Sequence, residues 1–198
     1  MIDEDLLIKF GAKLVVFEKG EIVFRQGDSP RYYFQIQNGA VKMNNFNDGG
    51  KEFVQGLFTA GDSFGEPPLF IEDLYATNTS ALIHSALFLL PKNRFLQLLK
   101  ENPDVHLAVT VNLAKRLYFR SIMASEISSQ EPEHRVLKLL DYFKIKVFCI
   151  ASDQKYRVEI TRQQIANLTG LRVETVIRSI KSLEKKGELL IDNHKVYR

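Results

Sequence analysis

The chain has 198 residues, of which 45% are hydrophobic and 26% charged, a composition that suits one or two folded domains with buried cores. The longest nearly apolar stretch, residues 81–91, is too short to cross a bilayer, and the acidic start at residues 1–5 differs from the basic start of a secretory signal. The single cysteine, Cys149, excludes a disulfide framework or a four-cysteine metal site within one chain. We therefore expect a cytoplasmic protein.

The net charge of +3 is divided unevenly along the chain. Residues 1–133 contain 13 basic and 17 acidic side chains, for −4, whereas residues 134–198 contain 14 and 7, for +7. A basic module joined to a mildly acidic one is typical of nucleic-acid binding, because phosphate contacts supply most of the non-specific affinity. Charge alone does not separate this interpretation from an ordinary domain with surplus lysines.

The first predicted region, residues 14–90, consists of short β-branched and aromatic runs separated by turn signals. Gly20, Gly27, Gly39 and Gly61 mark some of these turns, and the runs between them have the length of strands. The pattern predicts an antiparallel sandwich or roll, with a helical turn and a loop within residues 64–75.

Helices are predicted from residue 91 onward. A short one covers residues 92–100, and a longer one begins with Pro103 in its first turn and is free of glycine and proline as far as Pro132. We expect Leu113, Phe119 and Ile122 to pack on the chain's own β-roll. Small and apolar residues recur in this helix at spacings of three and four, which lets two helices approach closely. Packing on the β-roll is the alternative for this seam too, but we favour the interface of a homodimer, formed by Leu107, Thr110, Ala114, Leu117, Ser121 and Ala124.

The basic C-terminal region predicts a third unit. An amphipathic helix from residue 133 is followed by a strand at 157–160, two short helices and a hairpin that turns at Asp192-Asn193. Thr161 and Gln164 form a capping box that opens the first short helix. Ala166 and Gly170 have the spacing of a helix-turn-helix, in which a small residue permits close packing and glycine makes the turn.

The second helix of this pair, predicted at residues 172–186, carries Glu174 and Arg178 on one face. Arginine can donate two hydrogen bonds to guanine, and a carboxylate can accept one from cytosine. These roles are favoured over a simple surface ion pair, which contributes little to stability. The candidate phosphate contacts, which position the protein without reading sequence, are Arg162, Arg172 and Thr175.

Together these motifs resemble the cyclic-AMP-receptor/FNR (CRP/FNR) family of bacterial transcription regulators over nearly the whole chain. The resemblance implies an α+β chain with a cyclic-nucleotide-binding-like β-roll at 1–101, a dimerisation helix at 102–131 and a winged helix-turn-helix at 132–198. It also implies double-stranded DNA with an inverted repeat and a second copy of the chain as partners, with RNA polymerase as a candidate partner. The segments that carry the resemblance are K19-G-E, G27-D, N38-G, G61-D-S-F-G-E, N102-P-D, T161-R-Q-Q-I-A and V173-E-T-V-I-R.

The chain departs from the family at the cyclic-nucleotide site. Relatives place Gly-Glu against the ribose and an arginine against the cyclic phosphate. Here Gly65-Glu66 is present, but the arginine position falls on Ala76, followed by Thr77, and residues 52–91 contain no lysine or arginine. Because a buried phosphate without a cation is costly, we do not expect cyclic nucleotide binding of the usual kind. The candidate effector pocket consists of Gly65, Glu66, Ala76, Thr77, Arg120 and Ser121.

Two alternatives stay open. The first is a true cyclic-AMP-responsive regulator whose cation comes from Arg31 or from the partner subunit's Arg120. The second is a β-roll enzyme or scaffold whose basic module binds RNA or protein. The histidines lack the paired spacing of metal ligands, and we expect no metal, no cofactor and no catalytic residue.

Overall fold

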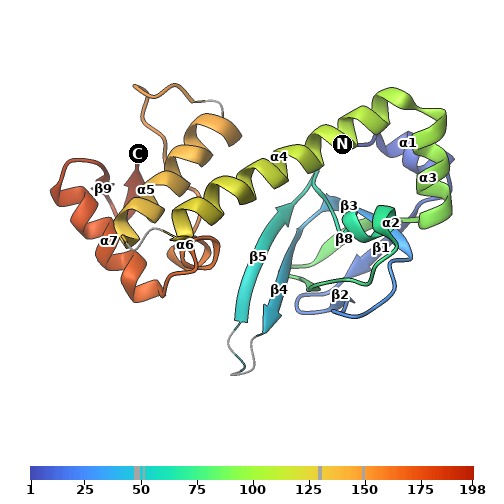
Figure 1. The fold of residues 1–198 in the computed structure, drawn as a ribbon, viewed down its shortest axis with the longest axis horizontal. Coiled ribbons are helices and arrows are strands. Elements are labelled where there is room, and N and C mark those ends of the chain that lie inside the picture. Colours follow the sequence, from blue (N-terminus) through green and yellow to red (C-terminus); the bar gives the residue numbers. More distant parts are fainter. Residues whose placement is uncertain (47–49, 51, 129–130, 149) are drawn as a thin grey trace. The chain divides into compact units, whose positions relative to one another are not determined.

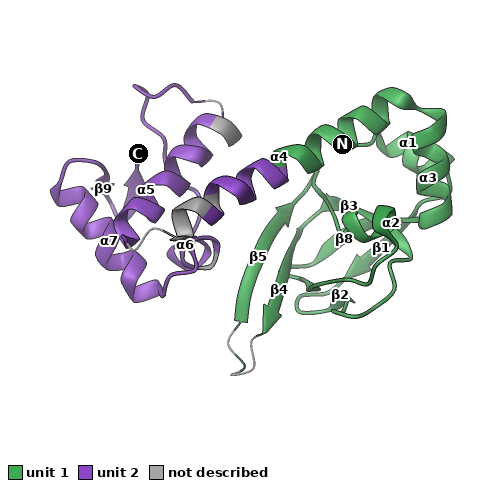
Figure 2. Cartoon of the chain, in the orientation of Figure 1, with its two compact units in different colours: residues 1–115 green, residues 116–198 purple. Residues whose placement is uncertain are grey.

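The computed structural model describes residues 1–46, 50, 52–128, 131–148 and 150–198 (Figure 1). The chain divides into two compact units, residues 1–115 and residues 116–198, and the division falls within one long helix, α4 (Pro103–Ser128) (Figure 2). No helix in the described part of the chain is long and apolar enough to span a membrane.

Unit 1 is built on two antiparallel four-stranded sheets. One has the strand order β1-β8-β3-β6 and the other the order β2-β7-β4-β5. The strands are β1 (Lys13–Phe17), β2 (Ile22–Phe24), β3 (Tyr32–Asn38), β4 (Ala40–Phe46), β5 (Glu52–Thr59), β6 (Ser63–Phe64), β7 (Asn78–Ala81) and β8 (Ser85–Pro91). The helices are α1 (Glu4–Lys9), α2 (Pro67–Ile71), α3 (Lys92–Glu101) and the first part of α4.

Strand β8 accounts for most of the apolar stretch at residues 81–91. It lies between β1 and β3 in its sheet and is buried on both faces. Leu87 packs in an aromatic-rich cluster with Phe34 and Phe64, whose rings stack at 5.2 Å. Phe88 and Leu90 belong to a second cluster, which includes buried residues of α1, α3 and α4. A strand covered on both sides needs a continuous apolar sequence rather than an alternating one.

The turn between β3 and β4 requires glycine. Gly39 has φ +100°, and a Cβ atom there would lie 2.2 Å from Ser85 Oγ and 2.6 Å from its Cα. The same hydroxyl accepts a hydrogen bond from Ala40 N at 3.1 Å. The Asn38-Gly39 turn signal therefore marks both a left-handed backbone conformation and a close approach of two chain segments.

Unit 2 contains the end of α4, then α5 (Pro132–Tyr142), a π-helical segment (Phe143–Val147), α6 (Arg162–Thr169), α7 (Val173–Lys185), β9 (Leu190–Asp192) and β10 (Lys195–Tyr197). In its core, the apolar faces of α5, α6 and α7 pack against the β9–β10 hairpin. The fully buried residues include Val136, Leu139, Leu140, Ile165, Ala166, Val176, Ile180, Leu183 and Val196. The predicted fold class, a β-roll followed by helices and a C-terminal helix-turn-helix, is confirmed.

Three local predictions change. The segment at 157–160 forms only a single bridge, between Arg157 and Tyr197, although Val158 N also donates to Val196 O at 2.9 Å. The hairpin turns at Asn193 and His194, both with positive φ, so that Asp192 instead ends β9 opposite Lys195.

The third change concerns the side chains of α4. Leu113 packs against the helix-covered cluster of unit 1, as expected. Phe119 packs instead against the core of unit 2, with its ring 4.3 Å from that of Tyr142. Helical periodicity identifies a buried position but not the neighbour that buries it.

Candidate nucleic-acid interface

Helix α6 begins at a fully formed capping box. Gln164 N donates to Thr161 Oγ1 at 3.1 Å, and Thr161 N donates to Gln164 Oε1 at 2.7 Å. The helix ends at Gly170, whose φ of +70° lets the chain reverse into α7. Ala166, 1% exposed, lies in the shared core of α5, α6 and α7, where a larger side chain would separate the helices. Ala166 and Gly170 therefore have the roles that their spacing predicts: Ala166 packs between the helices and Gly170 forms the turn.

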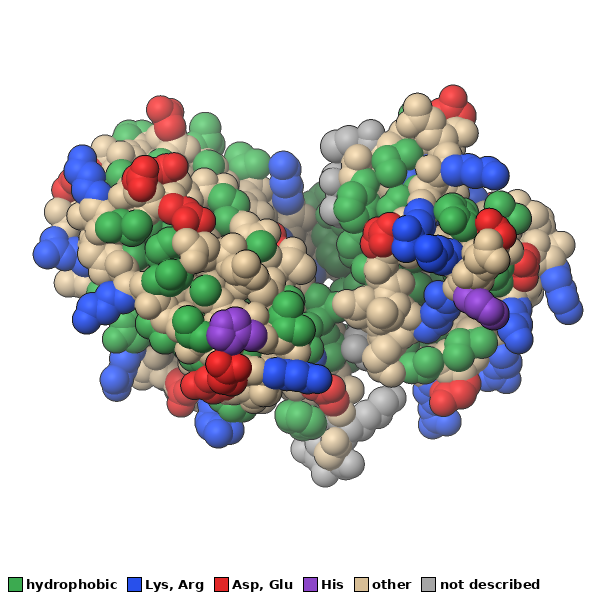
Figure 3. Space-filling model, turned by 180° about the vertical axis from the view of Figure 1, so that it is seen from behind, with side chains coloured by type: hydrophobic (Ala, Val, Ile, Leu, Met, Phe, Trp, Pro, Cys, Tyr) green, Lys and Arg blue, Asp and Glu red, His purple; other side chains and the backbone are tan. Residues whose placement is uncertain are grey.

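Helix α7 has two distinct faces. Val176, Ser179, Ile180 and Leu183 are buried in unit 2. The opposite face is exposed, with Glu174, Ile177 (40% exposed), Arg178 and Lys181 at helical spacing. Figure 3 shows Lys and Arg side chains along the surface of the C-terminal unit, at the right of that view. The exposed face can therefore meet a polyanion without any rearrangement of the core.

Glu174 and Arg178 do not form an ion pair with each other in the part of the chain that the structure describes. Both remain available for a partner outside the chain. Lys181 was not singled out from the sequence, although its spacing of seven residues from Glu174 places it on the same face. It adds a cation next to Arg178 on this surface.

The three candidate phosphate contacts differ in their surroundings. Arg172 is the exposed N-cap of α7, and Thr175 is half-buried in its first turn. Arg162 is half-buried, and its Nη2 donates to the carbonyl of His194 at 3.3 Å. Arg162 therefore also ties the start of α6 to the turn of the β9–β10 hairpin.

A second tether holds the hairpin to α5. Arg198 donates from Nε to Asp141 Oδ1 at 2.5 Å and from Nη2 to Asp141 Oδ2 at 3.2 Å, and its Nη1 donates to Glu188. The hydrogen bonds with Asp141 are the main reason that the pKa of Arg198 is raised above its usual value. The guanidinium group is thereby fixed in a two-pronged geometry typical of strong arginine–carboxylate pairs.

All six residues of the predicted dimer seam of α4 are exposed in the single chain. Leu107 is 63% and Leu117 is 70% exposed, far above the values of core leucines. The remaining seam residues, Thr110, Ala114, Ser121 and Ala124, are exposed as well. An apolar helix face without cover in a single chain is the surface that a second helix would bury.

The residues of the candidate effector pocket differ in their exposure. Glu66 is 1% and Thr77 is 5% exposed, whereas Ala76 is on the surface. A Cβ atom at Gly65 would lie 3.2–3.3 Å from the rings of Phe24 and Tyr75. These two rings stack at 3.7 Å and cover Gly65. Arg120 and Ser121 are exposed residues of α4 in unit 2.

Uncharged amides occupy the surroundings of Ala76. Asn45 Nδ2 donates to the Ala76 carbonyl at 2.7 Å and to Gln26 Oε1 at 3.1 Å, and Gln55 Nε2 donates to Asn45 Oδ1 at 2.5 Å. The Ala76 carbonyl and Asn45 Oδ1 thus accept hydrogen bonds from uncharged amide groups. No group of three or more potential metal ligands occurs among the described residues.

Two family models cover most of the chain. The cyclic nucleotide-binding domain matches residues 14–102, and the Crp-like helix-turn-helix domain matches residues 134–196. The chain belongs to the CRP/FNR family of transcription regulators. The recognition made from the motifs is thus confirmed, together with a DNA-binding regulatory function.

Individual CRP/FNR proteins are similar along their length. The cAMP-activated global transcriptional regulator CRP of Haemophilus influenzae is 28% identical over 186 residues, covering 91% of this chain and 78% of its own. The transcriptional activator protein anr of Pseudomonas aeruginosa is 25% identical over 197 residues, covering 98% and 78%. The structure of the c-di-GMP-responsive global regulator CLP of Xanthomonas campestris covers 98% of both chains with a TM-score of 0.74 and 25% identity.

Proposed function

We propose that this CRP/FNR regulator acts as a homodimer that reads an inverted repeat in double-stranded DNA through α7. The observation that carries the proposal is the exposed face of α7, where Glu174, Ile177, Arg178 and Lys181 project from a helix whose other face is buried. An exposed second helix of a helix-turn-helix is the element that enters the major groove. Arg178 reads a guanine and Glu174 a cytosine on the opposite strand.

The other contacts position the protein on the duplex. Arg162, Arg172 and Thr175 bind phosphates, and the β9–β10 hairpin serves as the wing. The domain division that we propose is a β-roll at 1–101, a dimerisation helix at 102–131 and the DNA-binding module at 132–198. RNA polymerase is a candidate further partner, and the role is one of binding rather than catalysis. We place the protein in the cytoplasm, where bacterial DNA is found.

The test of this function is a gel-shift titration with double-stranded and single-stranded DNA and with RNA of the same sequence. We expect the double-stranded inverted repeat, once selected from a random library, to bind at least 10³-fold more tightly than unrelated duplex, as specific DNA-binding proteins do. Tighter binding of RNA or of single strands would instead favour the scaffold with an RNA-binding module.

We further propose that the β-roll does not bind a cyclic nucleotide in the manner of cyclic-AMP receptors. Residues 52–91 provide no cation, and Asn45 and Gln55 already occupy the neighbourhood of Ala76. Arg31, the alternative source of a cation, lines a different cavity that contains none of Gly65, Glu66, Ala76 and Thr77.

Cyclic AMP at millimolar concentration is therefore expected neither to raise the melting temperature nor to tighten DNA binding. A ligand selective for the native state must stabilise it by mass action, by about 2.7 kcal/mol at a hundred times its Kd. Differential scanning fluorimetry with cyclic AMP and cyclic GMP measures the effect. A rise of several degrees in the melting temperature at sub-millimolar cyclic AMP would contradict this proposal and favour the alternative, a cyclic-AMP-responsive regulator.

A further inference from the structure

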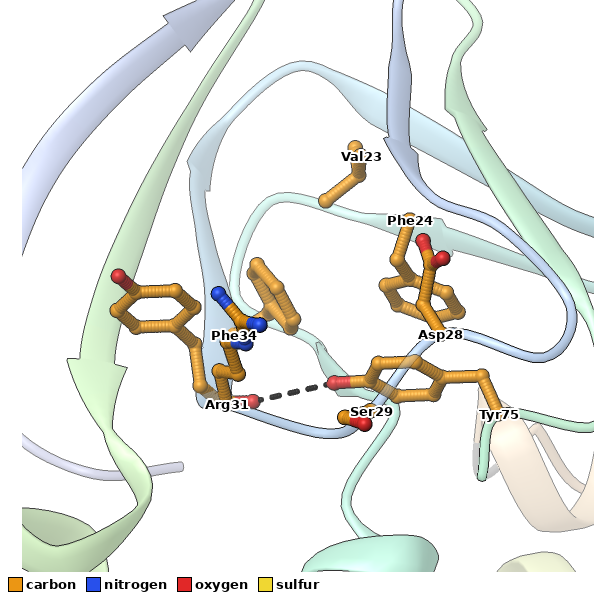
Figure 4. A pocket seen from close by; sticks show the side chains of 8 residues that line it. Val23, Phe24, Asp28, Ser29, Arg31, Phe34 and Tyr75 are labelled. Carbon is orange, nitrogen blue, oxygen red and sulfur yellow. Dashed lines mark hydrogen bonds between the residues drawn. The ribbon is translucent and has the colours of Figure 1, made fainter.

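A separate cavity of about 350 Å³ opens in unit 1, between the end of β2, the loop that follows it and the start of β3 (Figure 4). Its volume lies within the range of about 300–1,000 Å³ that is usual for small-molecule sites. The rings of Phe24 and Tyr75, which lie close to Gly65, also line this cavity. None of the predicted effector residues lines it.

The walls of this cavity are flat aromatic rings that are already in place. Phe24 stacks on Tyr75 at 3.7 Å with an interplanar angle of 11°, and the Phe24 and Phe34 rings are 5.6 Å apart. All three side chains are at least 95% buried. Only small parts of these rings are open to the cavity, but the core already fixes them, so an aromatic ligand would contact those parts without reorganising the core.

The hydroxyl of Tyr75 adds a fixed polar edge. Burial raises the pKa of Tyr75 well above its usual value, and the charges of Glu66 and Asp28 raise it further. The hydroxyl therefore stays protonated and donates to the carbonyl of Tyr32 at 3.4 Å.

Two opposite charges enter the cavity from different sides. Figure 4 shows Arg31 on one side and Asp28 on the other, with the ring of Phe34 between them. Among the described residues, the guanidinium of Arg31 has no hydrogen-bond or ion-pair partner. Asp28 Oδ2 accepts from Arg25 N at 2.8 Å, and Oδ1 has no such bond with any residue that the structure describes. Neither charge neutralises the other, and a ligand with one carboxylate and one ammonium group would satisfy both.

A purely anionic ligand suits this cavity less well. Asp28 lines it, and the charge of Glu66 also reaches Tyr75. A phosphate would gain Arg31 as a partner but would meet the carboxylate of Asp28. An ammonium group beside Asp28 turns that repulsion into attraction.

We propose that this cavity binds a free aromatic amino acid, with its ring against Phe24, Phe34 and Tyr75, its carboxylate on Arg31 and its ammonium group on Asp28. The exposed hydroxyl of Ser29 at the rim is a further donor to the carboxylate. The inference does not rest on DNA binding, because it concerns unit 1 alone and its test needs no operator.

The test is calorimetric titration of the purified full chain with L-phenylalanine and three compounds that each lack one feature. They are 3-phenylpropanoate, without the ammonium group; phenethylamine, without the carboxylate; and L-leucine, without the ring. L-Phenylalanine is expected to bind at least about tenfold more tightly than each of the three, since each of them lacks one of the three contacts that the proposed site makes. Equal affinity for any one of them, or no heat with phenylalanine, tyrosine or tryptophan at millimolar concentration, would overturn the proposal.

Variants locate the site. Arg31→Gln and Asp28→Asn are each expected to weaken phenylalanine binding at least about tenfold, and the asparagine keeps an oxygen for Arg25 N. Arg94→Gln, at an exposed arginine of α3, is the charge-matched control and should leave affinity unchanged. Circular dichroism verifies that all three variants fold. Binding that survives both pocket variants, or that falls equally in the control, assigns the ligand to another place and refutes this site.

Discussion

A chain carrying Ala114→Glu and Leu117→Glu is expected to sediment as a monomer and to lose tight operator binding. Both positions lie on the exposed seam of α4, where the proposed mate helix would bury them. Two facing pairs of glutamates would place like charges in an apolar contact, which is costly because each charge loses water without gaining a partner. Each half-site then binds alone, and the affinity gained by linking two sites is lost.

The matched control is the pair Ala108→Glu and Lys115→Glu. These positions are exposed on the same helix but point away from the seam, so they add the same side chains without entering the interface. Sedimentation velocity at micromolar concentration, followed by gel shift, measures both properties. A wild-type chain that is monomeric and still binds its operator tightly would contradict the dimer.

Arg178→Ala is expected to cost about 1–3 kcal/mol of operator affinity and to relax the preference at one guanine in each half-site. Arg178 is exposed in the first half of α7. Glu174 should specify a cytosine on the opposite strand, as in a TGA-type core. The side chain of Ile177 neither donates nor accepts a hydrogen bond. The operator base pair that it faces should therefore be loosely specified or favour thymine, whose methyl group it can contact. The half-site centres are expected about 34 Å apart, one turn of DNA.

Arg162→Ala serves as the contrast. It should weaken all sequences alike and lower the slope of affinity against salt by about one, because a phosphate contact carries no sequence information. Selection of bound oligonucleotides with each variant distinguishes the two roles. If Arg178→Ala lowers affinity uniformly and leaves the selected motif unchanged, Arg178 is only a phosphate clamp.

Local rules predicted the helix-turn-helix well. The capping box at Thr161, the glycine turn at Gly170 and the buried stripe of α7 all depend on residues within a few positions of one another. Such features can be predicted from the sequence because helix geometry determines their hydrogen bonds and spacings. The long helix α4 followed from the same kind of reasoning, whereas its dimer seam stays a prediction.

Contacts between distant residues were not predictable in the same way. The stack of Phe24 on Tyr75 joins residues from different strands and loops, and it both covers Gly65 and creates the aromatic cavity. The neighbour of Phe119, Tyr142, lies in a separate helix. The hairpin turn moved by one residue because His194 adopts a left-handed conformation, which sequence preference assigns to asparagine or glycine.

The tether of Arg198 to Asp141 has a consequence for the mechanics of the wing. A two-stranded hairpin is at best marginally stable by itself in water. Here Arg198, which follows β10, is hydrogen-bonded to Asp141 of α5, and Arg162 of α6 is hydrogen-bonded to the turn. These contacts with two helices stabilise the hairpin. A displacement of α5 is therefore expected to move the β9–β10 hairpin with it.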